Sequence, residues 1–235
     1  MAGDAAGTGL AASPIRGLIQ TAALGGGLWS LSSLGYFWLS DVLGAEIGYN
    51  DAPLVFALYY GVFCLISAIV FRTLYRDLLA DEAAKYLLPV LAMAALFAGY
   101  TLLVLPRLPA TVWSHDTAPV EFFWATPSYF LPKSVEILFQ QLLVAALVLS
   151  INRLGVSMLR LSISVALLFG GFHLTLAFSY PNPLYVMRYS VAAMAFGAMV
   201  PWLLLRVRKG LLFSYAIHWG YYALDIVAIH VAFAA

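Results

Sequence analysis

The sequence predicts an all-α fold, a polytopic transmembrane helix bundle of about seven spans, from its composition, its long apolar segments and its few charges. Of the 235 residues, 63% are hydrophobic and only 10% are charged, and the mean hydropathy is +0.92. A soluble domain carries about 25% charged residues. The composition therefore excludes an ordinary soluble enzyme, and the net charge of +1 gives no sign of a nucleic-acid partner.

Each predicted span is a window of about 20 mainly apolar residues, the length that crosses a bilayer. The seven windows cover roughly residues 17–39, 53–71, 86–105, 134–151, 160–179, 184–205 and 211–233. The fourth begins after Pro132, which suits a first helical turn, and Pro201 is expected to kink the sixth.

The chain shows no internal repeat and no long linker, which predicts one domain. Residues 1–16 are expected to be a mobile cytoplasmic tail, and residues 17–235 a single transmembrane helical domain. The loop at about 106–133 is long and rich in aromatic residues. This is typical of a segment at the membrane interface, or of a lid that covers a site.

Basic residues are distributed unevenly between the two predicted sides of the bundle. Nine of the twelve Lys and Arg precede the first span or lie in the loops that follow spans two, four and six. Cytoplasmic loops are enriched in Lys and Arg, so this bias predicts a cytoplasmic N-terminus and an external C-terminus. The Ala- and Leu-rich composition suggests a bacterial inner membrane.

The fourth and fifth predicted spans carry ionisable residues at membrane depth, where a charge costs about 2.5–3.5 kcal/mol on insertion scales. Glu136 lies one turn into the fourth span, and Gln140 follows at i+4 on the same face. His173 lies in the fifth span after Gly170 and Gly171, whose small size lets another helix backbone approach.

The seventh predicted span carries His218, Tyr222 and Asp225 at spacing i, i+4, i+7, which places all three on one helical stripe. Asp225 has no basic residue within its own span, so it must bond His, Tyr or water, or stay protonated. His230, close to the end of the span, is expected to be interfacial.

Each of these residues also has a purely structural interpretation. In that interpretation Glu136 favours the helix N-terminus or reaches the interface, His173 bonds a neighbouring carbonyl, and Tyr222 with Asp225 only joins helices. If the helices adjoin, a carboxylate and two imidazoles offer two chemistries. They can activate a water and stabilise an oxyanion, or Glu136, His173 and His218 can ligate a divalent metal. The sequence contains no HExxH, GxSxG or P-loop motif.

Three segments of the chain occur in the same order as the three sequence motifs of a known family. They read VEILFQQ at 135–141, FGGFH at 169–173 and HWGYYALD at 218–225. Over roughly residues 130–225 the chain resembles the CAAX protease and bacteriocin-processing (CPBP) family of intramembrane glutamic proteases. The motifs of that family are EExxxR, FxxxH and HxxxN or HxxxD, and they match Glu136, Phe169 with His173, and His218.

Three positions depart from these motifs: Val135 stands in place of the first Glu, Gln140 in place of the Arg, and Tyr222 in place of the Asn or Asp. The resemblance implies that Glu136 is the general base and that His173 holds or orients the water.

The same resemblance implies that His218 with Tyr222 stabilises the oxyanion, while Gln140, Phe169 and Asp225 support the site, with Asp225 replacing lost acidity. It implies no cofactor. The substrates would be membrane-anchored or exported proteins in the lipid bilayer. The alternatives are a catalytically degenerate protein of the same fold that binds a membrane partner without cutting it, and a transporter that handles metal ions or protons.

Overall fold

The computed structural model describes residues 14–44, 47–76, 78, 84–112, 120–178 and 182–235, and the account below concerns these residues. They confirm the all-helical class, since the described part holds no strand and its only bridge joins Thr111 to Ala234. The longer helices are α1 (Pro14–Gly44), α2 (Pro53–Val70), α4 (Ala84–Gly99), α6 (Phe130–Asn152), α7 (Met158–His173), α8 (Pro183–Arg206) and α9 (Gly210–Ala232).

Short segments complete the described chain. They are α3 (Arg72–Tyr75), the π turn η1 (Tyr100–Val104), α5 (Val120–Phe123) and the 3-10 turns η2 (Leu105–Arg107), η3 (Pro127–Tyr129) and η4 (Leu174–Phe178). The turns η1, η3 and η4 extend neighbouring helices, so that α4 continues to Arg107 and α7 to Phe178.

Helices occupy all seven segments that the sequence marks as spans. Five of them are long and apolar enough to cross a membrane: Pro53–Val70, Lys85–Arg107, Pro127–Asn152, Met158–Phe178 and Pro183–Arg206. The helices α1 and α9 are not among these five; α1 contains glycines and serines, and α9 contains ionisable and tyrosine side chains. The structure is therefore consistent with a membrane bundle, in which five described helices are long and apolar enough to cross a membrane.

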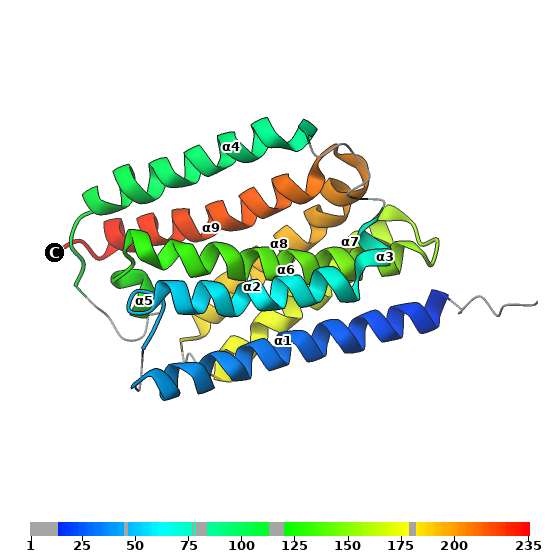
Figure 1. The fold of residues 1–235 in the computed structure, drawn as a ribbon, viewed down its shortest axis with the longest axis horizontal. Helices are drawn as coiled ribbons and strands as arrows, with labels where there is room; N and C mark the ends of the chain where they lie inside the picture. Colours follow the sequence, from blue (N-terminus) through cyan, green and yellow to red (C-terminus); the bar gives the residue numbers. More distant parts are fainter. Residues whose placement is uncertain (1–13, 45–46, 77, 79–83, 113–119, 179–181) are drawn as a thin grey trace, which may run out of the picture.

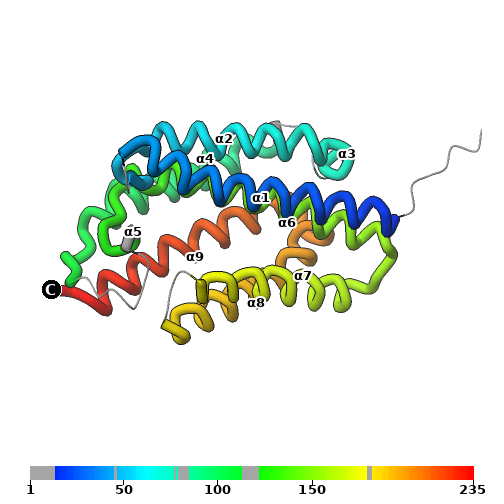
Figure 2. Tube along the Cα trace, turned by 90° about the horizontal axis from the view of Figure 1, so that it is seen from below, coloured from blue at the N-terminus to red at the C-terminus, as the bar shows by residue number. Residues whose placement is uncertain are grey.

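Helix α6 lies at the centre of the bundle. It contacts α1, α2, α3, α7 and α9, while α1 and α4 lie at opposite edges (Figure 1). The helices α7 and α8 pack against each other on one side of the bundle, and α1 and α2 lie on the other (Figure 2). This arrangement surrounds the residues of α6 with those of α7 and α9.

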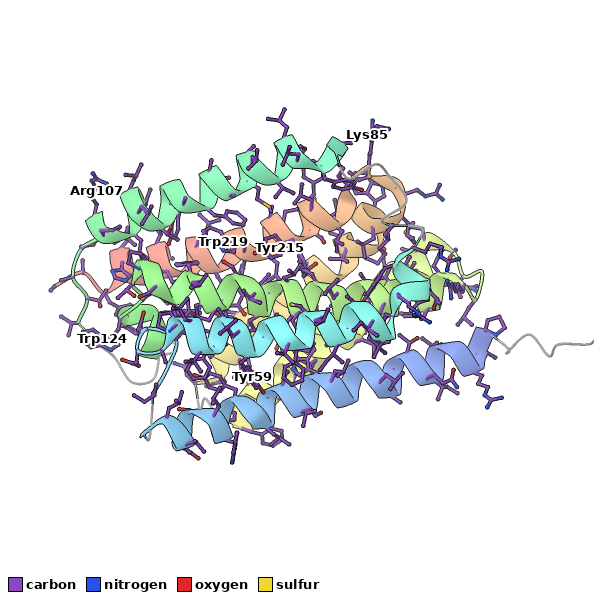
Figure 3. The ribbon with its side chains drawn as sticks, in the orientation of Figure 1. Tyr59, Lys85, Arg107, Trp124, Tyr215 and Trp219 are labelled. Atoms are coloured by element: carbon purple, nitrogen blue, oxygen red, sulfur yellow. The ribbon has the colours of Figure 1, made fainter. Side chains whose placement is uncertain are left out.

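The structure bears on three expectations from the sequence: the N-terminal tail, the long loop and the kink at Pro201. Helix α1 begins at Pro14, so Pro14–Arg16 are helical, and residues 1–13 of the expected tail lie outside the described residues. In the long loop, Phe122 and Phe123 of α5 are buried against the bundle, whereas Trp124 is exposed at its edge (Figure 3). Helix α8 continues through Pro201 to Arg206.

Candidate active site

The carboxylate of Glu136 lies inside the bundle and accepts hydrogen bonds from three donors. Its Oε2 accepts from the Tyr49 hydroxyl and from Lys133 Nζ, each at 2.9 Å, and its Oε1 accepts from Gln140 Nε2 at 2.9 Å. A carboxylate has about four acceptor sites. Glu136 is thus nearly saturated, and its remaining capacity is on Oε1.

Lys133 provides the counter-charge of Glu136 one turn earlier on α6. The exposed fractions of the two side chains are only 10% and 16%, and the ammonium lies 4.1 Å from the centre of the Tyr222 ring. Burial, and then the nearby Glu136 carboxylate, raise the pKa of Tyr49 well above its usual value of 10, so this phenol stays a donor. The cluster is therefore neutral overall and internally paired.

His173 is the last residue of α7, where the chain tightens into the turn η4. Its Nδ1 lies 2.7 Å from the carbonyl oxygen of Phe169, one turn earlier. A carbonyl only accepts, so Nδ1 carries the proton, and Nε2 of the neutral ring is left as an acceptor. The carbonyl bond expected as a structural alternative is present, and it also fixes the tautomer of the ring.

His218 has the opposite tautomer because of Gln141. The Ser214 hydroxyl lies 2.8 Å from Gln141 Oε1, so the amide nitrogen of Gln141 faces His218 Nδ1 at 2.9 Å. An amide NH₂ donates, so His218 Nδ1 accepts and Nε2 carries the proton. All three side chains are buried, which makes an unpaired arrangement costly.

Two hydrogen bonds from α9 to Ser134 of α6 hold α9 against α6 and so hold His218 in place. The Tyr215 hydroxyl donates to the Ser134 carbonyl at 3.0 Å, and Trp219 Nε1 donates to the Ser134 hydroxyl at 2.9 Å. Tyr222 stacks on His218, with ring centres 5.6 Å apart. The Tyr222 ring thus lies between Lys133 and His218 and links the two polar groups.

Asp225 belongs to a separate cluster. It is ion-paired with Arg188 of α8, and its Oδ2 accepts from the Tyr189 hydroxyl at 2.6 Å. The tyrosine bond fits the sequence expectation, whereas the Arg188 pair was not foreseen because Arg188 lies on another helix. Asp225 is therefore paired with Arg188, and its hydrogen bonds in the described part of the chain go to Arg188 and Tyr189 and not to Glu136 or His218. Its expected role in replacing lost acidity at the site stays a prediction.

Two adjoining cavities bring the predicted residues together. One, of about 210 Å³, is lined by Lys133, Glu136, Gln140 and other side chains, with Phe122 of the long loop among them. The other, of about 390 Å³, is lined by Phe169, Phe196, His218 and neighbouring residues of α8 and α9. The two cavities share three lining residues, which are His173, Tyr189 and Tyr222.

The cavities explain which motif residues meet. His173 faces both, so it lies between Glu136 on one side and His218 on the other. Val135 lines neither cavity and packs against the core. In the described part of the chain, no group of three or more His, Cys, Asp or Glu residues is placed to hold a metal ion, so Glu136, His173 and His218 do not form a ligand set.

The prediction from sequence missed three residues of the site. Lys133 and Gln141 are polar residues within an apolar α6 segment, a signal that could have identified them; Tyr49 precedes α2 and gave no such signal. His230, expected at the interface, is buried, and its Nδ1 lies 2.9 Å from the Pro109 carbonyl.

Glycines at the α7–α8 contact match part of the expectation from sequence. A Cβ at Gly170 would lie 2.0 Å from Met194 Cγ, so a second helix does approach there, whereas Gly171 has nothing within 4 Å. At Gly197 of α8 the approach is to the backbone of α7, where a Cβ would lie 2.9 Å from the Val165 oxygen.

Comparisons of the chain with protein-family models, with curated proteins and with solved structures give no match.

Proposed function

We propose that this protein is a membrane-embedded peptidase of the CPBP type, which hydrolyses peptide bonds of membrane-anchored or exported proteins. The observation that carries the proposal is the pair of adjoining cavities, in which His173 separates the Glu136 cluster from His218. Residues of all three motif-like segments thus line two adjoining cavities among α6, α7, α8 and α9.

The tautomers of the two histidines suit the two needs of amide hydrolysis. His173 Nε2 is an acceptor and can take the proton of a water that attacks the carbonyl carbon. His218 Nε2–H is a donor and can bond the oxyanion that forms on the carbonyl oxygen. The imidazolium of His173 then returns the proton to the leaving amine as the C–N bond breaks.

Glu136 has a different role in this scheme from the general base implied by the family resemblance. Three donors occupy most of its acceptor capacity, which leaves few lone pairs to take the proton of a water. The remaining acceptor capacity of Oε1 can orient the attacking water, and its negative charge can stabilise the imidazolium of His173. Tyr222 supports the site by holding the His218 ring in place, and Phe169 by bonding His173.

The proposal extends to membrane topology. We propose seven crossings, counting α1 and α9, with the N-terminus in the cytoplasm of a bacterial cell and the C-terminus outside the inner membrane. A helix of 23 residues such as α9 is about 34 Å long, enough to span the hydrocarbon core. The start of α1 and the C-terminus lie at opposite ends of the bundle (Figure 1), as an odd number of crossings requires.

The test is a cleavage assay on the purified full chain in lipid nanodiscs with a library of membrane-anchored, fluorogenic peptides. We expect cleavage by the wild-type chain, and a loss of about 100-fold or more in His173→Gln and His218→Gln, since each removes an acid–base or oxyanion group. His230→Gln is the matched control, because His230 is also a buried histidine of α9 but bonds Pro109 away from the cavities. Equal rates in the site variants and the control would refute the proposal.

A second candidate function is binding of a membrane protein segment without cleavage. The buried Lys133–Glu136 pair favours it, because a carboxylate held by an ammonium and two further donors already has stable partners. On this account the library yields no cleavage, and restoring Glu at 135 and Arg at 140 gains none. A cross-linker at Tyr222 would then capture a membrane protein.

A further inference from the structure

Helix α4 is attached to the bundle mainly towards its Arg107 end. Phe97 stacks on Trp219 with ring centres 3.8 Å apart and planes within 7°, and the Tyr100 hydroxyl donates to the Ala223 carbonyl at 2.8 Å. Figure 3 shows Lys85 at the other end of the same helix, far from this attachment. There a cavity of about 560 Å³ lies between α4, α6 and the turn that joins α8 to α9.

The walls of this cavity are mostly apolar. Val90 and Met93 of α4 face Leu138 of α6, Leu204 of α8 and Leu212 of α9 across it. Val90 and Leu138 are 40% and 39% exposed, so the cavity borders the lipid-facing surface of the bundle. Water is poorly held in such a space, because a bound water needs two to four polar partners. An acyl chain fits it better.

The rim of the cavity is basic. Arg208 and Lys209 from the α8–α9 turn line it, and Lys85 lies at the adjoining end of α4. Lys209 has φ of +63°, the only positive φ of a non-glycine residue in the described chain. The left-handed conformation is unfavourable for a residue with a Cβ, so the surrounding structure holds Lys209 in it.

The side chain of Lys209 contacts the first turns of α4. Its Nζ donates to the carbonyl of Lys85, the group that lacks its usual helical partner because Pro89 has no N–H. The same ammonium lies 5.5 Å from the centre of the Tyr86 ring. Lys209 is therefore fixed at the mouth of the cavity, where its positive charge meets the apolar recess.

We propose that this cavity is a binding site for an anionic glycerophospholipid. Its phosphate would lie against Lys85, Arg208 and Lys209, and one acyl chain would enter the recess between α4 and α9. The volume is within the usual 300–1,000 Å³ range of ligand sites. Basic pockets between transmembrane helices at the cytoplasmic side bind such head groups. The site shares no lining residue with the histidine cavities and does not depend on hydrolysis.

The test uses the full chain in mild detergent and native mass spectrometry with an equal mixture of phosphatidylglycerol and phosphatidylcholine of identical acyl chains. We expect phosphatidylglycerol to be retained preferentially. Arg208→Gln and Lys85→Gln should each reduce this preference about fivefold, the effect of about 1 kcal/mol per basic residue. Arg107→Gln is the matched control, since it removes an exposed basic residue at the opposite end of the α4 segment.

A second pair of variants tests the recess itself. Val90→Trp should fill it and reduce retention of phosphatidylglycerol, whereas Leu96→Trp, on the same helix at an exposed position outside the cavity, should not. The proposal is overturned if the wild-type chain retains both lipids equally. It is also overturned if either control variant, Arg107→Gln or Leu96→Trp, reduces the retention of phosphatidylglycerol as much as the cavity variants do. Displacement of the lipid by an equal concentration of inorganic phosphate would also overturn it, because the site would then recognise a free anion.

Discussion

At the residue scale, the most consequential feature of the bundle is a charge pair that is almost wholly buried. Lys133 and Glu136 lie three residues apart on α6, and the charge of each removes part of the cost of burying the other. Tyr49 and Gln140 satisfy further acceptor sites of the carboxylate. The pair is therefore stable as a unit and vulnerable when either member is lost.

Single substitutions should expose this dependence. Lys133→Met strands the carboxylate and Glu136→Gln strands the ammonium, so each should lower the free energy of unfolding by about 3 kcal/mol. The double variant should lose less than the sum of the two. Unfolding in mild detergent, arranged as a double-mutant cycle, measures the coupling. Additive losses of only about 0.5 kcal/mol, the size of an ordinary surface change, would contradict the account.

At the element scale, the contact between α7 and α8 holds His173 beside His218. The helices approach so closely at Gly197 that a Cβ there would lie 2.9 Å from the Val165 oxygen and 3.0 Å from the Ala166 Cα. Both atoms belong to the backbone of α7, which cannot move aside as a side chain can. The position of His173 at the end of α7 depends on this fit.

The same Gly→Ala substitution at two positions distinguishes the effect of the close helix contact from the effect of replacing a glycine. Gly197→Ala should push α7 from α8 and destabilise the bundle by about 1–3 kcal/mol, the usual cost of overpacking. Gly171→Ala is the matched control, because a Cβ at Gly171 meets nothing within 4 Å. Thermal unfolding midpoints in detergent compare the two. Equal midpoints would mean that the close approach does not stabilise the bundle.

Also at this scale, the helices were more predictable than the contacts between them. Apolar windows predicted the positions of the helices to within a few residues, because length and hydropathy determine a span locally. Pairing of Asp225 with Arg188, or of Glu136 with Tyr49, could not be predicted from the sequence, because these partners are 37 and 87 residues apart. Polarity identified Glu136, His173 and His218, but only packing decided which donors they meet.

At the scale of the whole molecule, the account depends on three helices delivering two histidines in opposite tautomers to adjoining cavities. Helix α7 contributes the Phe169 carbonyl, which accepts a hydrogen bond from His173 and so keeps the ring proton on Nδ1, and α6 contributes Gln141, which leaves His218 protonated at Nε2. One ring thus accepts and the other donates. The proposed hydrolysis needs a ring that accepts a proton and a ring that donates a hydrogen bond at the same time.

The most direct measurement is the ¹⁵N NMR spectrum of the full chain labelled at histidine, at neutral pH, with signals assigned through single His→Gln variants. The account predicts protonated Nδ1 and bare Nε2 for His173, and the reverse for His218. It also predicts that Gln141→Leu converts His218 to a mixture of tautomers and leaves His173 unchanged. A single shared tautomer for both rings, or a His218 signal indifferent to Gln141→Leu, would contradict it.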